Sequence, residues 1–364
     1  MRAAVLIEPN RPLEVLEVDL EAPDPDQVRV AVAACGVCHS DVSLVNGTFP
    51  IMGPTVPGHE AAGVVTEVGS GVTHLSVGDH VVLSPNPACG HCRSCRRGRP
   101  GACAETAALM TSTFPDGSTK LSRGGEVLYR GLGLAGWATE VVVSGNGAVA
   151  IADDVPLDVA CVIGCAVQTG VGAALNTASI EPGDSVLVVG AGGIGVSIAA
   201  GAAIAGATRV IVSDPSEARR EQAMQFGATD VIDPTRTDVV AEVSSLVPGG
   251  VDTAFDAVGS AALIDTCLAA TCNGGETVLV GAAPMTDSVS VNPVTMMFAE
   301  KGIKGSLLGS SLAPRDIPRL VELWRAGRLP LDQMVTARLP LAEVNDAVRD
   351  AEAGKGLRTV LMMD

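Results

Sequence analysis

The stretch that decides the fold is Ser185–Asp214, SVLVVGAGGIGVSIAAGAAIAGATRVIVSD. Its run Val186–Val189 is wholly apolar, as expected of a strand that is buried on both faces in a parallel sheet. A glycine-rich loop, an alanine-rich segment and a second apolar run, Arg209–Ser213, follow before Asp214. Strand, loop, helix and strand in this order predict a βαβ unit of a doubly wound parallel sheet.

The loop GAGGIG matches the G-x-G-x-x-G pattern. Gly190 permits a tight turn, Gly192 lets the backbone approach a pyrophosphate, and Gly195 lets the helix pack closely on the strand. The free N–H groups at the helix N-terminus bind the pyrophosphate. We therefore predict a dinucleotide site that includes Gly190, Gly192, Gly193, Ile194 and Gly195. The motif alone leaves an ordinary glycine-rich turn as the alternative.

The acid at the end of the second strand favours NAD over NADP. Asp214 follows the loop by about 20 residues, where a carboxylate hydrogen-bonds the adenosine ribose. The 2′-phosphate of NADP would meet this carboxylate and be repelled. Arg219 and Arg220 lie close to Asp214 in the sequence and could favour the 2′-phosphate of NADP, although both can lie beside the adenosine without selecting phosphate. We expect NAD, with Asp214 and Arg219 among its contacts.

A second motif is a group of four closely spaced cysteines. Cys89, Cys92, Cys95 and Cys103 follow the pattern C-x2-C-x2-C-x7-C. Four thiolates at one centre close a tetrahedral zinc site with no position for substrate, so the expected site is structural. An iron–sulfur cluster is the alternative, but the last gap does not match its usual spacing. We refer to residues 86–104 as the four-cysteine lobe.

Composition limits the class of protein. The chain has 364 residues, 47% of them hydrophobic, which is enough for two globular domains. Only 2% are aromatic, so Val, Ala, Leu and Ile must fill the cores. A net charge of −17 disfavours nucleic acid and anionic membrane as partners. The N-terminal apolar run is too short for a signal peptide, and no uninterrupted apolar stretch reaches the length of a membrane span. Ten cysteines in such a chain favour metal over disulfides, and we expect a cytoplasmic protein.

The order of patterns predicts the domains. The first 35 residues alternate apolar and polar positions, which indicates antiparallel strands. Helical and strand patterns alternate after Asp214, and residues 309–364 contain two further helices and two strands. We expect a catalytic domain at 1–166, an NAD-binding domain at 167–307, and a return to the catalytic domain at 308–364.

Taken jointly, the motifs resemble the zinc-dependent medium-chain alcohol dehydrogenases over essentially the whole length. The segments that carry the resemblance are Cys38-His39-Ser40-Asp41, Gly58-His59-Glu60, the four-cysteine lobe, Gly164-Cys165, the glycine loop with Asp214, and Gly356-Leu357-Arg358-Thr359-Val360. The resemblance implies an α/β fold, with a Rossmann domain and a mainly β, GroES-like catalytic domain.

The resemblance also implies a second zinc ion, bound by Cys38, His59 and Cys165. Two thiolates and one imidazole leave a fourth tetrahedral position open, as catalysis requires. Buried cysteines are usually inert, and Cys161 competes with Cys165 as the third ligand. We expect two zinc ions per chain, one catalytic and one structural.

The implied reaction is hydride transfer between a primary alcohol or aldehyde and NAD, with zinc as Lewis acid. Ser40 is expected to pass the proton, Asp41 to orient His59, and Glu60 to lie near the zinc. His39, Thr169 and Arg358 match family positions that contact the coenzyme. Many members carry a histidine three residues after the relay serine, but this chain has Ser43, so we expect a different proton exit.

Several alternatives remain open at this point. The stretch 114–137 resembles the longer loop of glutathione-linked members, so a thiol-adduct formaldehyde dehydrogenase is possible. Another variant keeps its NAD(H) bound and needs an artificial electron acceptor, and a non-catalytic zinc-binding protein is a third class. The resemblance implies a homodimer, with a tetramer as the alternative. Pro85 and Gly131 stand where ethanol-active relatives carry aromatic rings, which predicts a roomy pocket for medium or bulky alcohols.

Overall fold

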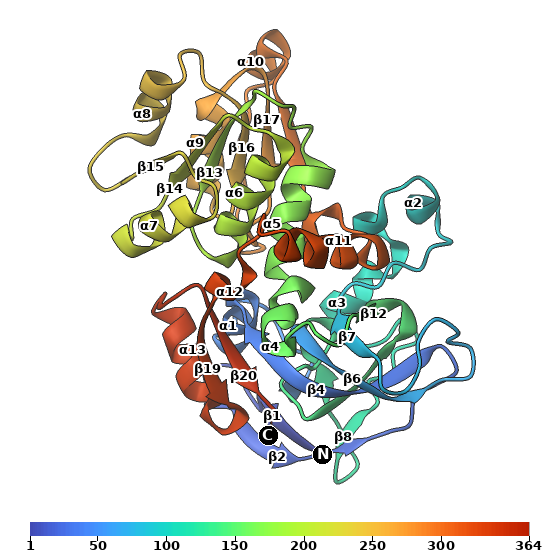
Figure 1. The fold of residues 1–364 in the computed structure, drawn as a ribbon. Helices are drawn as coiled ribbons and strands as arrows, with labels where there is room; N and C mark the ends of the chain where they lie inside the picture. Colours follow the sequence, from blue (N-terminus) through green and yellow to red (C-terminus); the bar gives the residue numbers. More distant parts are fainter. Residues whose placement is uncertain (364) are drawn as a thin grey trace. The chain divides into compact units, whose positions relative to one another are not determined.

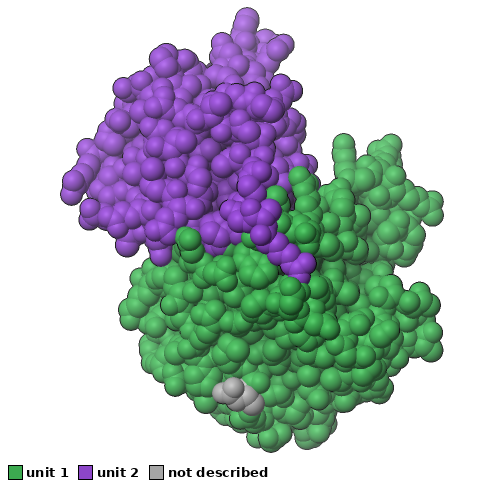
Figure 2. All heavy atoms as spheres, viewed as in Figure 1, with its two compact units in different colours: residues 1–165, 312–324, 331–364 green, residues 166–311, 325–330 purple. Residues whose placement is uncertain are grey.

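The computed structural model describes residues 1–363, which form two compact units (Figures 1 and 2). Unit 1 contains Met1–Cys165, Leu312–Trp324 and the described residues from Leu331 onward. Unit 2 contains Ala166–Ser311 and Arg325–Pro330. The division falls one residue before the first boundary expected from the sequence and four residues after the second. The short return of residues 325–330 to unit 2 was not expected.

Unit 2 is built on a six-stranded sheet whose neighbouring strands are all parallel. The order is β15-β14-β13-β16-β17-β18, which is the strand order 3-2-1-4-5-6. The strands are β13 (Ser185–Val189), β14 (Arg209–Ser213), β15 (Asp230–Ile232), β16 (Val251–Asp256), β17 (Thr271–Leu279) and β18 (Gly302–Gly305). This confirms the predicted doubly wound sheet. The order reverses between β13 and β16, where such sheets bind their ligands.

Two helices of unit 2 pack unusually closely. α6 (Gly193–Ala205) is apolar on all sides, and its partner α5 (Ala166–Gly172) continues as a π-helix, Ala173–Thr177. A Cβ added to Gly201 would lie 2.9 Å from Val171 Cα, so only glycine permits this approach. The other helices of the unit are α7 (Glu217–Gln225), α8 (Val239–Leu246), α9 (Ala261–Ala270) and α10 (Pro293–Ala299). The strand–helix alternation expected after Asp214 is therefore present.

Unit 1 is mainly β and is organised around the long strand β4 (Gln27–Val37). Its main sheet has the order β12-β7-β6-β4-β20-β19, and β11 also pairs with β4. These strands are β6 (Glu60–Val68), β7 (His80–Leu83), β11 (Glu140–Ser144), β12 (Ala148–Ile151), β19 (Val335–Pro340) and β20 (Arg358–Met362). Strand β20, from the C-terminal part of the chain, pairs with β4, from its N-terminal part (Figure 1). The core is mostly Val, Leu and Ala around the fully buried Trp137.

Shorter elements complete unit 1. The additional strands are β1 (Arg2–Val5), β2 (Glu14–Glu17), β3 (Asp19–Leu20), β5 (Thr55–Val56), β8 (Leu121–Arg123), β9 (Glu126–Val127) and β10 (Tyr129–Arg130). The α-helices are α1 (His39–Val45), α2 (Arg93–Arg96), α3 (Ala107–Thr111), α4 (Leu157–Ala160), α11 (Ala313–Arg325), α12 (Leu331–Met334) and α13 (Val344–Glu352). Within residues 1–363, no single helix is long and apolar enough to cross a membrane; only the bent pair Leu157–Gly164 and Ala166–Thr177 meets that test jointly.

Candidate active site and metal centres

Three predicted zinc ligands meet inside unit 1. Cys38 Sγ, a ring nitrogen of His59 and Cys165 Sγ all lie within 4.8 Å of one another, and all three residues are buried. A tetrahedral zinc ion with bonds of about 2.0–2.3 Å places its ligand atoms about 3.5–3.8 Å apart, so this donor set fits zinc. Cys161 is not part of the group, because its Sγ donates to the Asp158 carbonyl instead. The structure therefore brings together the triad that the resemblance implied.

A buried carboxylate holds two members of this triad in place. Asp41 is fully buried, and its Oδ2 accepts a hydrogen bond from Cys38 N–H at 3.1 Å. Its Oδ1 accepts from Gly58 N–H at 2.9 Å and lies 3.1 Å from His59 Nδ1. Burial lowers the pKa of His59, but the charge and hydrogen bond of Asp41 outweigh it and leave that pKa raised. Because Nδ1 bonds Asp41, Nε2 is the nitrogen left for a metal.

An ion pair lies behind the triad. Arg358 Nε is 3.0 Å from Glu60 Oε2, and both side chains are buried. Arg358 also donates to the Val37 carbonyl at 3.1 Å. The hydrogen bond from Cys165 lowers the pKa of Cys38, burial opposes this, and the positive charge of Arg358 lowers it further. In this pair the guanidinium of Arg358 favours the Cys38 thiolate. The contact of Arg358 with the coenzyme that the resemblance implied stays a prediction.

Helix α1 carries the predicted proton-relay residues. Ser40 is half-buried in its first turn, and its Oγ lies 3.9 Å from Cys38 Sγ. Ser43 is also half-buried, one turn further along the same face of the helix. His39 begins the helix and is exposed. Ser40 is thus the hydroxyl that α1 presents next to the triad.

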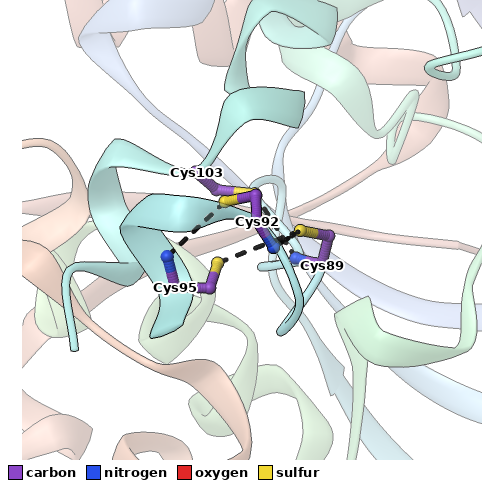
Figure 3. Close-up of side chains that lie close together, drawn as sticks. All are labelled: Cys89, Cys92, Cys95 and Cys103. Atoms are coloured by element: carbon purple, nitrogen blue, oxygen red, sulfur yellow. Dashed lines mark hydrogen bonds between the residues drawn. The ribbon is translucent and has the colours of Figure 1, made fainter. Parts of the chain in front are cut away.

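The four-cysteine lobe forms a compact group of sulfur atoms (Figure 3). Cys89 Sγ lies 4.0 Å from Cys95 Sγ and accepts a hydrogen bond from Cys92 N–H at 3.4 Å. Cys103 Sγ accepts from Cys89 N–H, and Cys92 Sγ accepts from Cys95 N–H at the start of α2. Hydrogen bonds from Cys95 N–H and a second backbone N–H lower the pKa of Cys92 to about 6. The separations fit the roughly 3.8 Å expected between thiolates on one zinc ion, and the set leaves no open position.

The glycine loop of unit 2 has the geometry expected at each of its three key positions. Gly190 has φ +96°, which only glycine adopts readily. A Cβ on Gly195 would lie 1.8 Å from the Gly190 carbonyl oxygen, so any side chain would push α6 off the loop. A Cβ on Gly192 would meet nothing within 4 Å, which leaves open space in front of the loop. Gly193 and Ile194 form the first turn of α6. The loop is therefore open where a pyrophosphate would lie.

The acid after β14 is bound to the loop itself. Asp214 is buried; its Oδ2 accepts from Ala191 N–H and its Oδ1 from Ser216 N–H, both at 2.8 Å. Arg220 donates to the Asp214 carbonyl at 2.7 Å and pairs with Asp233 at 3.1 Å, so this arginine is already engaged. That engagement weakens the argument for NADP. The other two predicted contacts in unit 2 are Arg219, half-buried on α7, and Thr169, buried on α5.

Two features of unit 1 differ from, or go beyond, what the sequence suggested. Gly131 was expected to leave free space, but a Cβ there would lie 2.7 Å from Pro57 Cα, so this part of the expectation is wrong. Gly36 was not singled out, yet a Cβ on it would lie 2.2 Å from Glu60 Oε2. Only glycine at position 36 leaves room for the buried Glu60. The one signal in the sequence for this role of Gly36 was its position two residues before the predicted ligand Cys38.

Comparisons with known proteins find related dehydrogenases along nearly the whole chain. A family model described as alcohol dehydrogenase GroES-like domain matches residues 24–153, and one described as zinc-binding dehydrogenase matches residues 193–326. An NDMA-dependent alcohol dehydrogenase from Amycolatopsis methanolica is 37% identical, covering 99% of this chain and 98% of the relative. An S-(hydroxymethyl)glutathione dehydrogenase from Paracoccus denitrificans is 34% identical, covering 99% of each chain.

A solved structure extends the likeness to the whole fold. Benzyl alcohol dehydrogenase from Acinetobacter calcoaceticus superposes with a TM-score of 0.94 at 32% identity, covering 100% of this chain and 99% of the other. The superposed part of this chain includes both units. The chain therefore belongs to the zinc-dependent medium-chain alcohol dehydrogenase family.

Proposed function

We propose that this enzyme transfers hydride reversibly between a primary alcohol or its aldehyde and NAD, with one catalytic and one structural zinc ion per chain. The observation that supports this most strongly is the buried triad of Cys38, His59 and Cys165, with Asp41 behind it and Ser40 beside it. A zinc ion at the triad would supply a Lewis acid for the substrate oxygen. A closed four-sulfur lobe elsewhere in unit 1 supports a separate structural ion.

In this proposal the residues of the chain hold the zinc ligands in place and carry away the proton of the alcohol. Asp41 fixes the ring of His59 and the backbone of Cys38, so the donor set is rigid before any metal binds. The Ser40 hydroxyl accepts the proton that the alcohol loses and passes it on. Ser43 is too weak a base to keep that proton, so it leaves through water or by way of His39.

We propose NAD as the coenzyme because of the open space at Gly192 and the buried carboxylate of Asp214. The NDMA-dependent relative supports a variant in which the nucleotide stays bound and an artificial acceptor regenerates it. Acid release and chromatography of the nucleotide from purified enzyme distinguish the two. Turnover that requires added NAD supports exchange of the coenzyme, whereas bound nucleotide with turnover only on NDMA supports the variant.

The proposed substrates are medium or bulky primary alcohols, including aromatic ones. The benzyl alcohol dehydrogenase neighbour supports this, as does Pro85 at a position where ethanol-active relatives carry an aromatic ring. Each methylene buried by a longer substrate is worth about 0.8 kcal/mol, or a few-fold in kcat/KM. Specificity constants for ethanol, hexanol and benzyl alcohol test the proposal, and a value for ethanol equal to the others contradicts it.

A thiol-dependent formaldehyde dehydrogenase is the second candidate, because the Paracoccus relative is named for an S-(hydroxymethyl)glutathione activity. NADH formation from formaldehyde with and without glutathione tests it. Activity that appears only with the thiol favours this candidate. The third candidate, a non-catalytic zinc-binding protein, requires zinc to be bound without turnover on any of these substrates.

We also propose a homodimer. Strand β18 is an edge of the sheet in unit 2. Within residues 1–363 it pairs with β17 alone, which leaves its other side free for a second strand. Met297 and Phe298 on neighbouring α10 are 65% and 79% exposed. Light scattering should give a dimer mass that Phe298→Lys reduces, whereas Met224→Lys, at an exposed apolar residue of α7, should not. A tetramer mass for the unmodified enzyme contradicts the proposal.

The cytoplasm is the proposed location. All ten cysteines are free thiols in the structure, and six of them belong to the two proposed zinc groups. Free thiols in this number are typical of a reducing compartment, where disulfides are rare. Cell fractionation tests this location, and recovery with secreted proteins contradicts it.

A further inference from the structure

A cavity of about 240 Å³ lies within unit 1, and none of the seven proposed zinc ligands lines it. Its walls come from the turn before β4, the end of β7, α3 with the turn that follows it, and the segment after β10. None of Cys38, His59 and Cys165 lines it, and every lining residue belongs to unit 1. The cavity is therefore distinct from the three proposed ligands of the catalytic zinc, although Pro85, which we place in the substrate pocket, is one of its lining residues.

The floor of this cavity carries a buried arginine. Arg130 is 3% exposed, and its guanidinium stacks on the Phe114 ring at 3.5 Å from the ring centre. Across residues 1–363, its side chain has no hydrogen bond and no carboxylate within ion-pair distance. Burial lowers the pKa of Arg130 to about 9, although the charge of Asp116 acts in the opposite direction. A buried, unpaired guanidinium facing a cavity is a ready site for a carboxylate.

The mouth of the cavity has the opposite charge. Asp26, Glu105 and Asp116 line it, and we call these three carboxylates the acidic rim. Within residues 1–363 none of them forms an ion pair, although Asp116 accepts a hydrogen bond from Ser118 N–H at 2.9 Å. Asp26 and Asp116 are exposed, and Glu105 is half-buried. A simple anion would be repelled at the acidic rim, and a simple cation would leave the arginine unpaired. The two charges together select a ligand that carries both.

The side walls are apolar. Leu109, Leu134 and Val143 are among the lining residues. Such a surface suits an aliphatic chain that joins two charged ends. We propose that the cavity binds an amino carboxylic acid whose carboxylate pairs with Arg130 and whose ammonium group faces the acidic rim, separated by an aliphatic spacer.

Three probes of matched length test this by calorimetry on the intact, zinc-loaded enzyme. They are 6-aminohexanoate, which carries both charges, hexanoate, which carries only the negative charge, and hexylamine, which carries only the positive charge. We expect measurable binding of 6-aminohexanoate, weakened at least tenfold by Arg130→Gln. Arg123→Gln, at an exposed arginine of the same unit, should leave binding unchanged.

A second variant keeps the test decisive if Arg130→Gln fails to fold. The double variant Asp26→Asn and Asp116→Asn changes only exposed side chains, so the fold should survive. It should weaken 6-aminohexanoate several-fold and strengthen hexanoate. No binding of 6-aminohexanoate at millimolar concentration, binding of hexanoate that is at least as tight, or indifference to these variants would overturn the proposal.

Discussion

Replacement of Asp41 by Asn tests whether this carboxylate organises the zinc triad. An amide has one oxygen, so it can accept from only one side of the present network. If its nitrogen takes the place of Oδ2, the Cys38 N–H loses its acceptor; if it takes the place of Oδ1, Gly58 N–H and His59 lose theirs. The first arrangement sacrifices fewer bonds, so the variant should adopt it.

The size of the effect follows from these contacts. The orphaned Cys38 N–H costs about 1–3 kcal/mol, and two charge-assisted bonds that become neutral lose about 1 kcal/mol each. Unfolding free energy should therefore fall by about 3–5 kcal/mol. Loss of a carboxylate behind a ligating histidine typically weakens metal binding by about 10- to 100-fold. Both effects should appear together, because the same carboxylate holds the backbone and the ligand.

Two measurements separate zinc binding from general damage. Denaturant unfolding gives the stability, and competition with a chromophoric chelator gives the zinc affinity. Asp316→Asn is the matched control, because Asp316 is also buried and also accepts a backbone N–H, from Leu312 at 2.8 Å. The control should lose stability and keep its zinc affinity. If Asp41→Asn kept wild-type zinc affinity and turnover, our account of Asp41 would be refuted.

Four further predictions concern the other sites. Cys165→Ala should lower the metal content from two zinc ions to one and abolish turnover in a folded protein. Cys95→Ala should mainly lower the melting temperature, because a closed zinc site contributes to folding. A Cys95→Ala variant that was as stable as the wild type and lost only activity would contradict this assignment of the two sites. Asp214→Gly should narrow the preference for NAD over NADP in kcat/KM, and a wild type that prefers NADP would contradict the assignment. Gly195→Ala should weaken NAD binding at least tenfold in fluorescence titration, because its methyl group would lie 1.8 Å from a loop carbonyl oxygen; unchanged affinity would show that the loop relaxes. Ser43→His should raise alcohol oxidation below about pH 7, near the pKa of histidine, and an unchanged pH–rate profile would argue against a relay limited at this residue.

The sequence alone determined the elements whose causes are local. The apolar run before Gly190, the glycine pattern and the acid of Asp214 predicted a βαβ unit, and the structure has β13, α6 and β14 there. The spacing of the four lobe cysteines likewise predicted a single cluster, because cysteines so close in the chain can direct their thiolates at one centre. In both cases the determining residues are close together in the chain, so the sequence pattern is sufficient to predict the element.

Only the tertiary structure decided which distant residues meet. The register of β4 against β6 sets Gly36 opposite Glu60, and the register of β20 against β4 sets Thr359 opposite Val37. Together these pairings bring Arg358 to Glu60 behind the triad, which no local pattern could indicate. The backbone of Pro57 likewise fills the space that the glycine at position 131 seemed to leave. Strand register and packing depend on the whole core at once. For that reason the sequence predicted the ligands and, by resemblance, Asp41 and Glu60, but neither the ion pair between Arg358 and Glu60 nor the approach of Pro57 to Gly131.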